Sequence, residues 1–206
     1  MKKIITYALM LLMVLGLVAC GEKTDDPNKG NEGGDAITED LTVEGFTVEA
    51  GKKVYVTTIG QSDFDTVINI LVRAGKEDTV NEQLLKASDV EAGSTVILVT
   101  GSSTKGLGSA GTDIGAENTR ATDFALAAKA GNFKLVVVHV GGEQRRGAQA
   151  DPIIRTVTPE ADLVMVVSTG NADGLFTTLT KEKNIPLYAY SRATKMVDSF
   201  KAILGL

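Results

Sequence analysis

The chain has 206 residues, of which 43% are hydrophobic and 23% are charged, and its net charge is −5 at pH 7. This length suits one globular α/β domain with some unstructured remainder. The acidic balance argues against nucleic acid as a partner, because phosphate-binding surfaces are cationic. There is no tryptophan, and aromatic residues make up only 5%. The core must therefore consist mostly of valine, isoleucine, leucine and alanine, which suits a parallel sheet covered by helices.

The first 19 residues have the pattern of an export signal. Lys2 and Lys3 precede an apolar run at residues 4–18, and Ala19 stands before Cys20, the only cysteine. This arrangement resembles the lipobox of bacterial lipoproteins. The resemblance implies cleavage before Cys20, lipidation of its thiol, and a protein held on the extracytoplasmic face of the cell membrane. The alternative is an uncleaved anchor helix, but about 15 apolar residues are few for a span, which usually needs about 20.

Residues 20–44 are rich in charged residues and glycine and contain few apolar side chains. Such a segment buries too little apolar surface to offset the entropy lost on ordering, so we predict a flexible acidic linker. Residues 45–206 form the single predicted α/β domain. Within it, Phe46 and Val48 are expected to add a short edge strand.

Strands and helices are predicted to alternate from residue 54 onward. Apolar, β-branched runs predict strands at residues 54–59, 96–100, 135–140, 163–167 and 186–190, with a short strand at 79–81. Apolar residues at helical spacing predict helices at about 64–74, 121–130, from 152, 175–179 and 196–204. Ser62 or Asp63, Asp151 and residues 171–174 are expected to cap helices. The alternation predicts a doubly wound, mostly parallel sheet of about five or six strands, in the Rossmann or flavodoxin-like class.

The segments that follow the predicted strands carry most of the polar signals. In sheets of this class, ligands bind beyond the carboxyl ends of the strands. Residues 101–113 are expected to form a long glycine-rich loop that brings backbone N–H groups close to a ligand. The predicted ligand-binding residues are Gln61, Ser62, Ser102, Ser103, Lys105, Gly106, Gly108, Glu143, Arg145, Arg146, Asn171 and Asp173.

The predicted ligand is a small polar molecule, and an anion fits best. Helix N-termini supply N–H donors and positive dipole ends. Lys105, Arg145 and Arg146 add positive charge, and arginine presents a fork that fits carboxylate or phosphate. The alternative for the two arginines is a solvated pair, or an ion pair with Glu143 or Asp151.

Several other patterns carry little weight. Residues 106–111 match the dinucleotide-binding glycine pattern, but they lie well past the end of the strand before them. In residues 101–106, Lys105 precedes the second glycine, whereas in a nucleotide-triphosphate loop the lysine follows it. His139 is the only histidine, lies in an apolar strand and has no paired nucleophile. We therefore expect no cofactor and no metal. A hard cation could use the acidic side chains of the loops, namely Asp63, Asp65, Asp113, Glu143 and Asp173, although Asp63 and Asp173 equally suit helix caps.

Four segments together resemble a family of exported bacterial proteins, often lipoproteins, that has no established activity. They are residues 60–62, 102–108, 142–147 and 173–176, and the resemblance covers about residues 54–206. It implies an α/β domain with these segments gathered at one edge. It implies no substrate and no catalytic residue, so function must be argued from the site.

Three functions are consistent with these patterns. The first is a membrane-tethered receptor for a small polar or anionic molecule outside the cytoplasm. The second is a hydrolase-like enzyme that uses Asp63, Glu143 or Asp173, which is less favoured because no nucleophile–histidine pair exists. The third is an envelope protein whose loops contact a partner protein.

Overall fold

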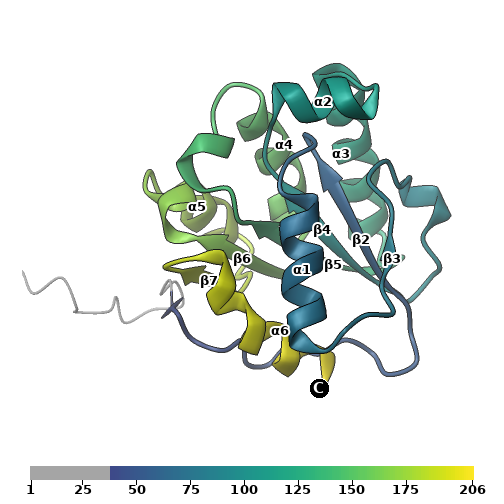
Figure 1. Ribbon diagram of the computed structural model, residues 1–206, viewed down its shortest axis with the longest axis vertical. Coiled ribbons are helices and arrows are strands. Elements are labelled where there is room, and N and C mark those ends of the chain that lie inside the picture. The colour runs from purple at the N-terminus through teal and green to yellow at the C-terminus, as the bar shows by residue number, and fades with distance from the viewer. Residues whose placement is uncertain (1–37) are drawn as a thin grey trace, which may run out of the picture. The chain divides into compact units, whose positions relative to one another are not determined.

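The predicted alternation of strands and helices is confirmed in the computed structural model, which describes residues 38–206 (Figure 1). The described residues form a seven-stranded sheet with the order β1-β7-β6-β5-β4-β2-β3, and each neighbouring pair runs parallel. The strands are β1 (Thr38–Glu39), β2 (Val54–Ile59), β3 (Val80–Asn81), β4 (Thr95–Thr100), β5 (Lys134–His139), β6 (Leu163–Val167) and β7 (Leu187–Tyr190).

Strand order reverses at β2. The chain leaves β2 for β3 on one side and returns to β4 on the other side, after which β5, β6 and β7 follow in turn. This is the order of flavodoxin-like sheets, in which the crevice at the reversal is the usual ligand position. The fold therefore places the reversal between the carboxyl ends of β2 and β4.

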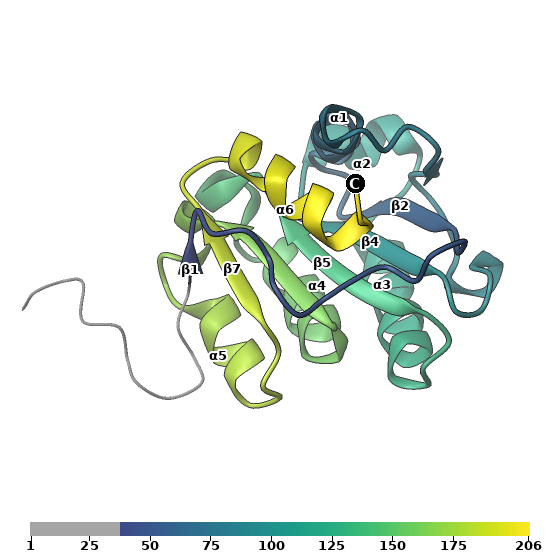
Figure 2. The same ribbon diagram turned by 90° about the horizontal axis from the view of Figure 1, so that it is seen from below.

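Helices cover both faces of the sheet, as Figure 2 shows. One face carries α1 (Phe64–Ala74) and α6 (Met196–Leu204), and the other carries α3 (Ile114–Lys129), α4 (Ala150–Val157) and α5 (Leu175–Lys181). Alternate residues of each central strand point to opposite faces, so Ile97 packs under α1 and α6 while Leu98 packs under α3 and α4. Within residues 38–206, no helix combines the length and apolar content needed to cross a bilayer.

The predicted edge strand at Phe46 and Val48 is wrong. This segment runs along α6, where the Val48 N–H donates to the Ile203 carbonyl over 2.7 Å. The seventh strand is instead β1, which pairs with β7. Val43, inside the predicted linker, is 3% exposed and packs against the α1–α6 core. Apolar content alone does not distinguish a segment that pairs with a strand from one that packs on a helix.

The expected long loop at residues 101–113 is also wrong, because α2 (Thr104–Ala110) occupies most of it. Ser103 caps α2 by accepting a hydrogen bond from the Gly106 N–H over 3.1 Å, and Leu107 buries its side chain. Gly106 lets α2 lie against the turn after β2, since a Cβ at this position would collide with the Gln61 carbonyl oxygen. The glycines therefore serve close helix packing rather than an open, ligand-wrapping loop.

Candidate ligand site at the carboxyl edge

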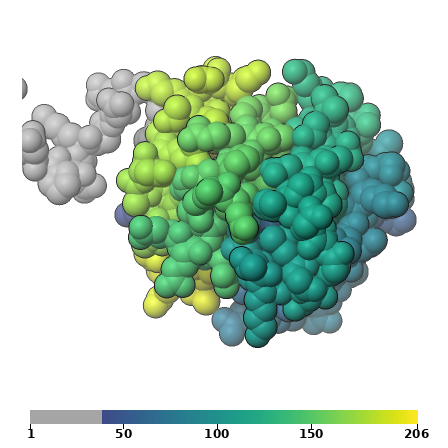
Figure 3. All heavy atoms as spheres, turned by 90° about the horizontal axis from the view of Figure 1, so that it is seen from above, coloured from purple at the N-terminus to yellow at the C-terminus, as the bar shows by residue number. Residues whose placement is uncertain are grey.

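The segments that follow β2, β4, β5 and β6 meet at one edge of the sheet, as the sequence predicts. The Ser103 N–H donates to the Gly60 carbonyl over 3.0 Å, and the Ser102 N–H donates to the Arg145 carbonyl over 3.1 Å. The guanidinium of Arg146 continues the chain of contacts to Asp173 over 2.8 Å. Figure 3 looks onto this edge, where green atoms after β5 lie between the teal atoms of α2 and the yellow-green atoms after β6. At the reversal of strand order the turns after β2 and β4 pack closely, because a Cβ at Gly60 would collide with the Gly101 carbonyl oxygen.

The turn between β2 and α1, residues 60–63, has an unusual backbone. Gly60, Gln61 and Asp63 have φ values of 90°, 57° and 57°, and the latter two are among only four non-glycine residues with positive φ in residues 38–206. A left-handed residue that has a Cβ costs about 1–2 kcal/mol, and such residues cluster at functional sites. We refer to this segment as the β2–α1 turn.

Helix α1 starts from the β2–α1 turn without a side-chain cap. Asp63 occupies the N-cap position, yet its carboxylate makes no capping hydrogen bond and lies 3.5 Å from Arg145 Nε instead. Ser62 or Asp63 was predicted as the N-cap, and Asp63 occupies that position, but its side chain does not form the capping hydrogen bond. The first N–H groups of a helix have no partner inside it. In α1, those of Phe64, Asp65 and Thr66 are therefore left to bind something else.

Unpartnered polar atoms gather at the same turn. Five buried side-chain oxygens have no hydrogen-bond partner among the described residues, and three of them are Gln61 Oε1, Ser62 Oγ and Asp63 Oδ2 in consecutive positions. Gln61 is 6% exposed and Ser62 is 4% exposed. Buried polar groups are nearly always paired, and leaving one unpaired costs about 1–3 kcal/mol. A cavity of about 280 Å³, here called the turn cavity, is lined by Gln61, Ser62, Asp63, Phe64, Asp65, Thr66 and Gln83.

A buried ion pair on α3 supports the β2–α1 turn from below. Glu117, which is fully buried, accepts from the Gly60 N–H over 2.8 Å and from Gln61 Nε2 over 3.0 Å. Its other oxygen accepts from Arg120 Nη1 over 2.8 Å. Arg120 also donates to carbonyl and hydroxyl oxygens from Thr57, Thr58, Gln83 and Leu85. Our sequence reading missed this pair, although Glu117 lies one turn before Ala121 on the predicted apolar face and could have been found there.

The second polar centre surrounds Arg146, between the segments after β5 and β6. The guanidinium donates to Asp151 through Nε (2.7 Å) and Nη2 (3.3 Å), to Asp173 through Nη2 (2.8 Å) and Nη1 (3.2 Å), and to the Gly170 carbonyl through Nη1. These five bonds use all five N–H groups of arginine. The side chain is only 8% exposed and lies over the Phe176 ring. We call Arg146, Asp151, Asp173 and Gly170 the Arg146 cluster.

Its carboxylates are held in the ionised form. Burial alone would raise the pKa of Asp151, but hydrogen bonds from Arg146 and the Gly147 N–H hold that pKa below its usual value. The hydrogen bond from Arg146 likewise lowers the pKa of Asp173. A neighbouring cavity of about 350 Å³, here called the Arg146 cavity, is lined by Glu143, Arg146, Gly147, Asp151, Thr169, Ala172 and Asp173. Arg146 is the one cationic side chain in this lining, and all five of its N–H groups are already used, so it has none left to bind an anion.

His139 lies beneath the Arg146 cluster and packs against the rings and backbone around it. Its Nδ1 is 2.8 Å from the Thr100 carbonyl and its Nε2 is 2.9 Å from the Gly142 carbonyl. Burial lowers the pKa of the ring, and it outweighs the two carbonyl contacts that favour the protonated form. His139 therefore packs between the ends of β4 and β5, and its buried ring takes up a proton less readily than an exposed histidine.

The remaining predicted site residues have various positions. Asn171 is buried and caps α5, because its Oδ1 accepts from the Phe176 N–H over 2.8 Å. Ser102 donates to Gln149 Oε1 over 2.9 Å. Lys105 and Gly108 are exposed on α2, and Glu143 is exposed after β5. Arg145 is 40% exposed, and its terminal nitrogens have no partner within residues 38–206. The twelve residues thus share one edge but not one site. Gln61 and Ser62 line the turn cavity, whereas Glu143, Arg146 and Asp173 line the cavity beside Arg146. Ser103, Lys105, Gly106 and Gly108 belong to α2 or its cap, and Ser102, Arg145 and Asn171 line neither cavity.

The candidate acids show little sign of metal or acid–base chemistry. No three His, Cys, Asp or Glu side chains gather as metal ligands among residues 38–206. Asp113, one of the cation candidates, caps α3 by accepting from the Ala116 N–H over 2.9 Å. Asp151, predicted as the cap before Pro152, lies inside α4 and binds Arg146. The lowered pKa of Asp173 makes its carboxylate a weak base at neutral pH.

Fold and edge together define a flavodoxin-like α/β domain with its polar centres at the carboxyl ends of the strands. Residues 51–204 match the family described as a domain of unknown function, DUF6305, and the chain belongs to that family. No curated protein matches the chain. No solved structure matches it either.

Proposed function

We propose that the folded domain is a binding module that takes a small polar, anionic ligand at the N-terminus of α1. One observation carries this proposal. The first residues of α1, which has no side-chain cap, line a cavity together with Gln61 and Ser62, two almost fully buried residues whose side-chain oxygens have no hydrogen-bond partner among the described residues. A helix N-terminus attracts anions through its free N–H groups and its dipole, and here no side chain satisfies those groups.

The position of the turn cavity supports this proposal. It lies at the carboxyl end of β2, beside the point at which strand order reverses, which is where sheets of this class bind ligands. Its volume of about 280 Å³ is at the small end of ligand cavities. Gln61 and Ser62, both in the predicted site, line it. Of the three cations expected to bind the anion, Lys105, Arg145 and Arg146, Arg146 has no free N–H group for one.

The domain is further proposed to act outside the cytoplasm as a lipoprotein held through Cys20. Both the signal at residues 1–19 and Cys20 lie outside the described residues, so this part rests on the lipobox pattern alone. Growth with a labelled fatty acid should label the wild-type protein but not Cys20→Ala. Label in both would remove the lipoprotein proposal.

Calorimetric titration of the purified full-length chain tests the binding proposal. The panel contains small carboxylates, inorganic phosphate and sulfate. We expect at least one carboxylate to bind, and we expect Ser62→Ala to weaken it by about tenfold, because a buried hydrogen bond to a charged group is lost. Ser102→Ala, which removes a hydroxyl that is already paired, is the matched control and should bind like wild type. Absence of binding across the panel, or equal affinity in wild type and Ser62→Ala, contradicts the proposal.

A further inference from the structure

The ring of His139, the only histidine of the chain, has two contacts that a neutral imidazole cannot both satisfy. Nδ1 lies 2.8 Å from the Thr100 carbonyl oxygen, and Nε2 lies 2.9 Å from the Gly142 carbonyl oxygen. Both partners can only accept a hydrogen bond, whereas a neutral imidazole has one N–H group and one lone pair. The imidazolium, which has two N–H groups, donates to both. In the neutral ring, a nitrogen lone pair faces one of the two carbonyl oxygens.

The two carbonyls differ in how firmly the fold holds them. Thr100 is the last residue of β4, is fully buried, and lies within the sheet between β2 and β5. Gly142 begins a short 3₁₀ helix, Gly142–Arg145, which has no side-chain cap. We therefore expect the neutral ring to keep its proton on Nδ1, bonded to Thr100, and to lose its contact with Gly142.

The charged groups around the ring modify its protonation but make no hydrogen bond to it. β4 and β6, the strands beside β5, have no ionisable side chain, and α5 has only Lys181, at the end away from Phe176. Arg146 lowers the pKa of the ring and Asp63 raises it, each by less than burial does. The other charged groups at the ends of β5 and β6 and the start of α4 are Glu143, Arg145, Asp151 and Asp173.

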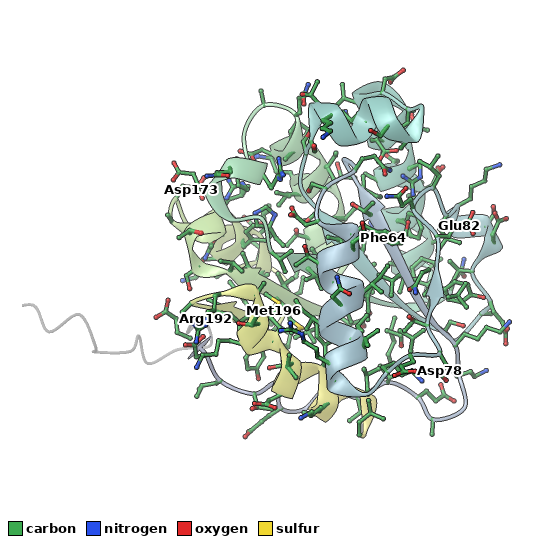
Figure 4. All side chains as sticks on the ribbon, in the orientation of Figure 1. Phe64, Asp78, Glu82, Asp173, Arg192 and Met196 are labelled. Carbon is green, nitrogen blue, oxygen red and sulfur yellow. The ribbon has the colours of Figure 1, made fainter. Side chains whose placement is uncertain are left out.

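Two of these acids are committed elsewhere. Asp151 and Asp173 bind Arg146, and Asp173 lies at the outer margin of the fold, as Figure 4 shows. No described side chain therefore takes the place of a second ring proton in holding Gly142.

We propose that His139 is a pH-sensitive latch between the sheet and the segment after β5. The neutral ring donates through Nδ1 to Thr100 and leaves Gly142 unheld. The protonated ring also donates through Nε2 to Gly142 and fixes the short helix Gly142–Arg145. Because burial opposes the second proton, the latch closes below the ordinary histidine pKa of about 6.5.

The segment that this latch holds contacts both polar centres of the edge. The Ser102 N–H donates to the Arg145 carbonyl over 3.1 Å, and Arg145 Nε lies 3.5 Å from Asp63 of the turn cavity. Arg146 follows directly, and its own N–H donates to the Glu143 carbonyl over 3.1 Å. Protonation of one buried ring therefore steadies the backbone that carries both arginines. The latch belongs to the ligand-free chain and does not depend on the proposed ligand.

Because the chain has one histidine, NMR of its ring reports on the latch directly. The full-length chain, labelled with ¹⁵N and prepared without a histidine tag, is titrated from pH 7.5 to pH 4.5. We expect a proton on Nδ1 alone at pH 7.5 and protons on both nitrogens at the acid end. A proton on Nε2 alone at pH 7.5, or no second proton by pH 4.5, overturns the proposal.

Amide hydrogen exchange in the same chain measures whether the segment becomes fixed. Protection of the Ser102 and Arg146 N–H groups, corrected for the intrinsic effect of pH, should rise about tenfold as the ring takes up its second proton, because a hydrogen bond from a charged donor is gained. The Asp162 N–H, which bonds to the Leu135 carbonyl near the other end of β5, is the control and should show no rise. Equal protection of Ser102 and Arg146 in both states of the ring overturns the latch.

Two variants assign the response to the ring. Glu143→Gln removes an exposed acid of the same segment and should keep the rise in protection, whereas His139→Gln should lose it. A rise retained in His139→Gln, or lost in Glu143→Gln, overturns the proposal. The ring titration uses the unaltered chain, so it decides the question even if His139→Gln does not fold.

Discussion

Two polar centres lie on the same edge of this sheet and differ in one respect. In the Arg146 cluster, every guanidinium N–H has an acceptor, and both carboxylates have donors. At the β2–α1 turn, three consecutive side chains carry buried oxygens without a hydrogen-bond partner among the described residues, although Asp63 forms an ion pair with Arg145, and α1 begins without a side-chain cap. A saturated cluster stabilises the fold and offers little to a ligand. A cluster with unpaired polar groups lowers the stability of the ligand-free protein, and a ligand that pairs those groups raises it.

The comparison also shows what each centre does to the backbone. Arg146 joins the segments after β5 and β6, in which only glycine residues have positive φ. The β2–α1 turn holds Gln61 and Asp63 in left-handed conformations, and the buried Glu117 fixes that geometry by accepting from Gly60 and Gln61. Strain and unpaired groups at one place, supported by a buried ion pair, are typical of a preorganised site.

The largest effect is expected for Glu117→Gln, which removes the support of the turn. The change removes the counter-charge of Arg120, whose side chain is 14% exposed, and the new amide must turn its N–H₂ group either toward Arg120 or toward the donors of the turn. Breaking a buried ion pair lowers stability by about 3–5 kcal/mol. Urea denaturation measures this. Glu91→Gln, which breaks the exposed ion pair between Lys53 and Glu91, is the control and should change stability far less, because exposed ion pairs contribute little. A loss below about 1 kcal/mol for Glu117→Gln would contradict the role given to this residue.

Arg146→Gln is expected to lower stability by about 2–3 kcal/mol, less than a fully buried pair because Asp173 reaches solvent. Its affinity for carboxylates should equal that of wild type. Denaturation and calorimetric titration on the same preparation separate the two properties. Loss of binding with stability retained would move the ligand site to the Arg146 cavity.

Ser62→Ala should stabilise the ligand-free protein by about 1 kcal/mol, because it removes an unpaired buried hydroxyl. Ser102→Ala should have the opposite sign and a similar or smaller size, since it breaks the bond to Gln149. Thermal denaturation of both variants gives the comparison directly. Destabilisation by Ser62→Ala in the absence of ligand would mean that this hydroxyl is already satisfied.

The smallest expected effect is a pH dependence near neutrality from His139, beneath the Arg146 cluster. Because burial lowers the pKa of the folded ring, protons bind the unfolded chain more readily, and stability falls as pH drops below the ordinary histidine value of about 6.5. Between pH 7 and 6 the loss is up to about 0.7 kcal/mol. A second loss follows below about pH 4, where Asp151 and Asp173 take up protons, since their pKa values are lowered in the folded state.

The variant His139→Gln should remove the first phase, the loss of stability between pH 7 and 6, and leave the second phase, the loss below about pH 4. Denaturation curves collected from pH 8 to pH 3 resolve the two. A first phase of unchanged size in the variant would assign it to some other group.

Sequence reasoning located the sheet because its strands are β-branched runs with plain boundaries, such as residues 96–100. It missed α2, because Gly106 and Gly108 lower helix propensity, whereas the cap by Ser103 and burial of Leu107 stabilise the helix. It placed Gln61 and Ser62 in the site because carboxyl-end segments of parallel strands converge. It could not choose the partners of Arg146, since Asp173 is 27 residues away and only folding brings it near. The unpaired state of Gln61 and Ser62 likewise depends on tertiary packing.

The central claim is that the ligand binds at the start of α1. Backbone amide signals of the isotope-labelled full-length chain, followed by NMR during titration with the small carboxylate that binds most tightly, test it most directly. We predict that the amide signals of Phe64, Asp65 and Thr66 move progressively and saturate, while those of Arg146 and Asp173 stay in place. Shifts centred on residues 143–151 and 169–173, or no shifts at all, would contradict the account.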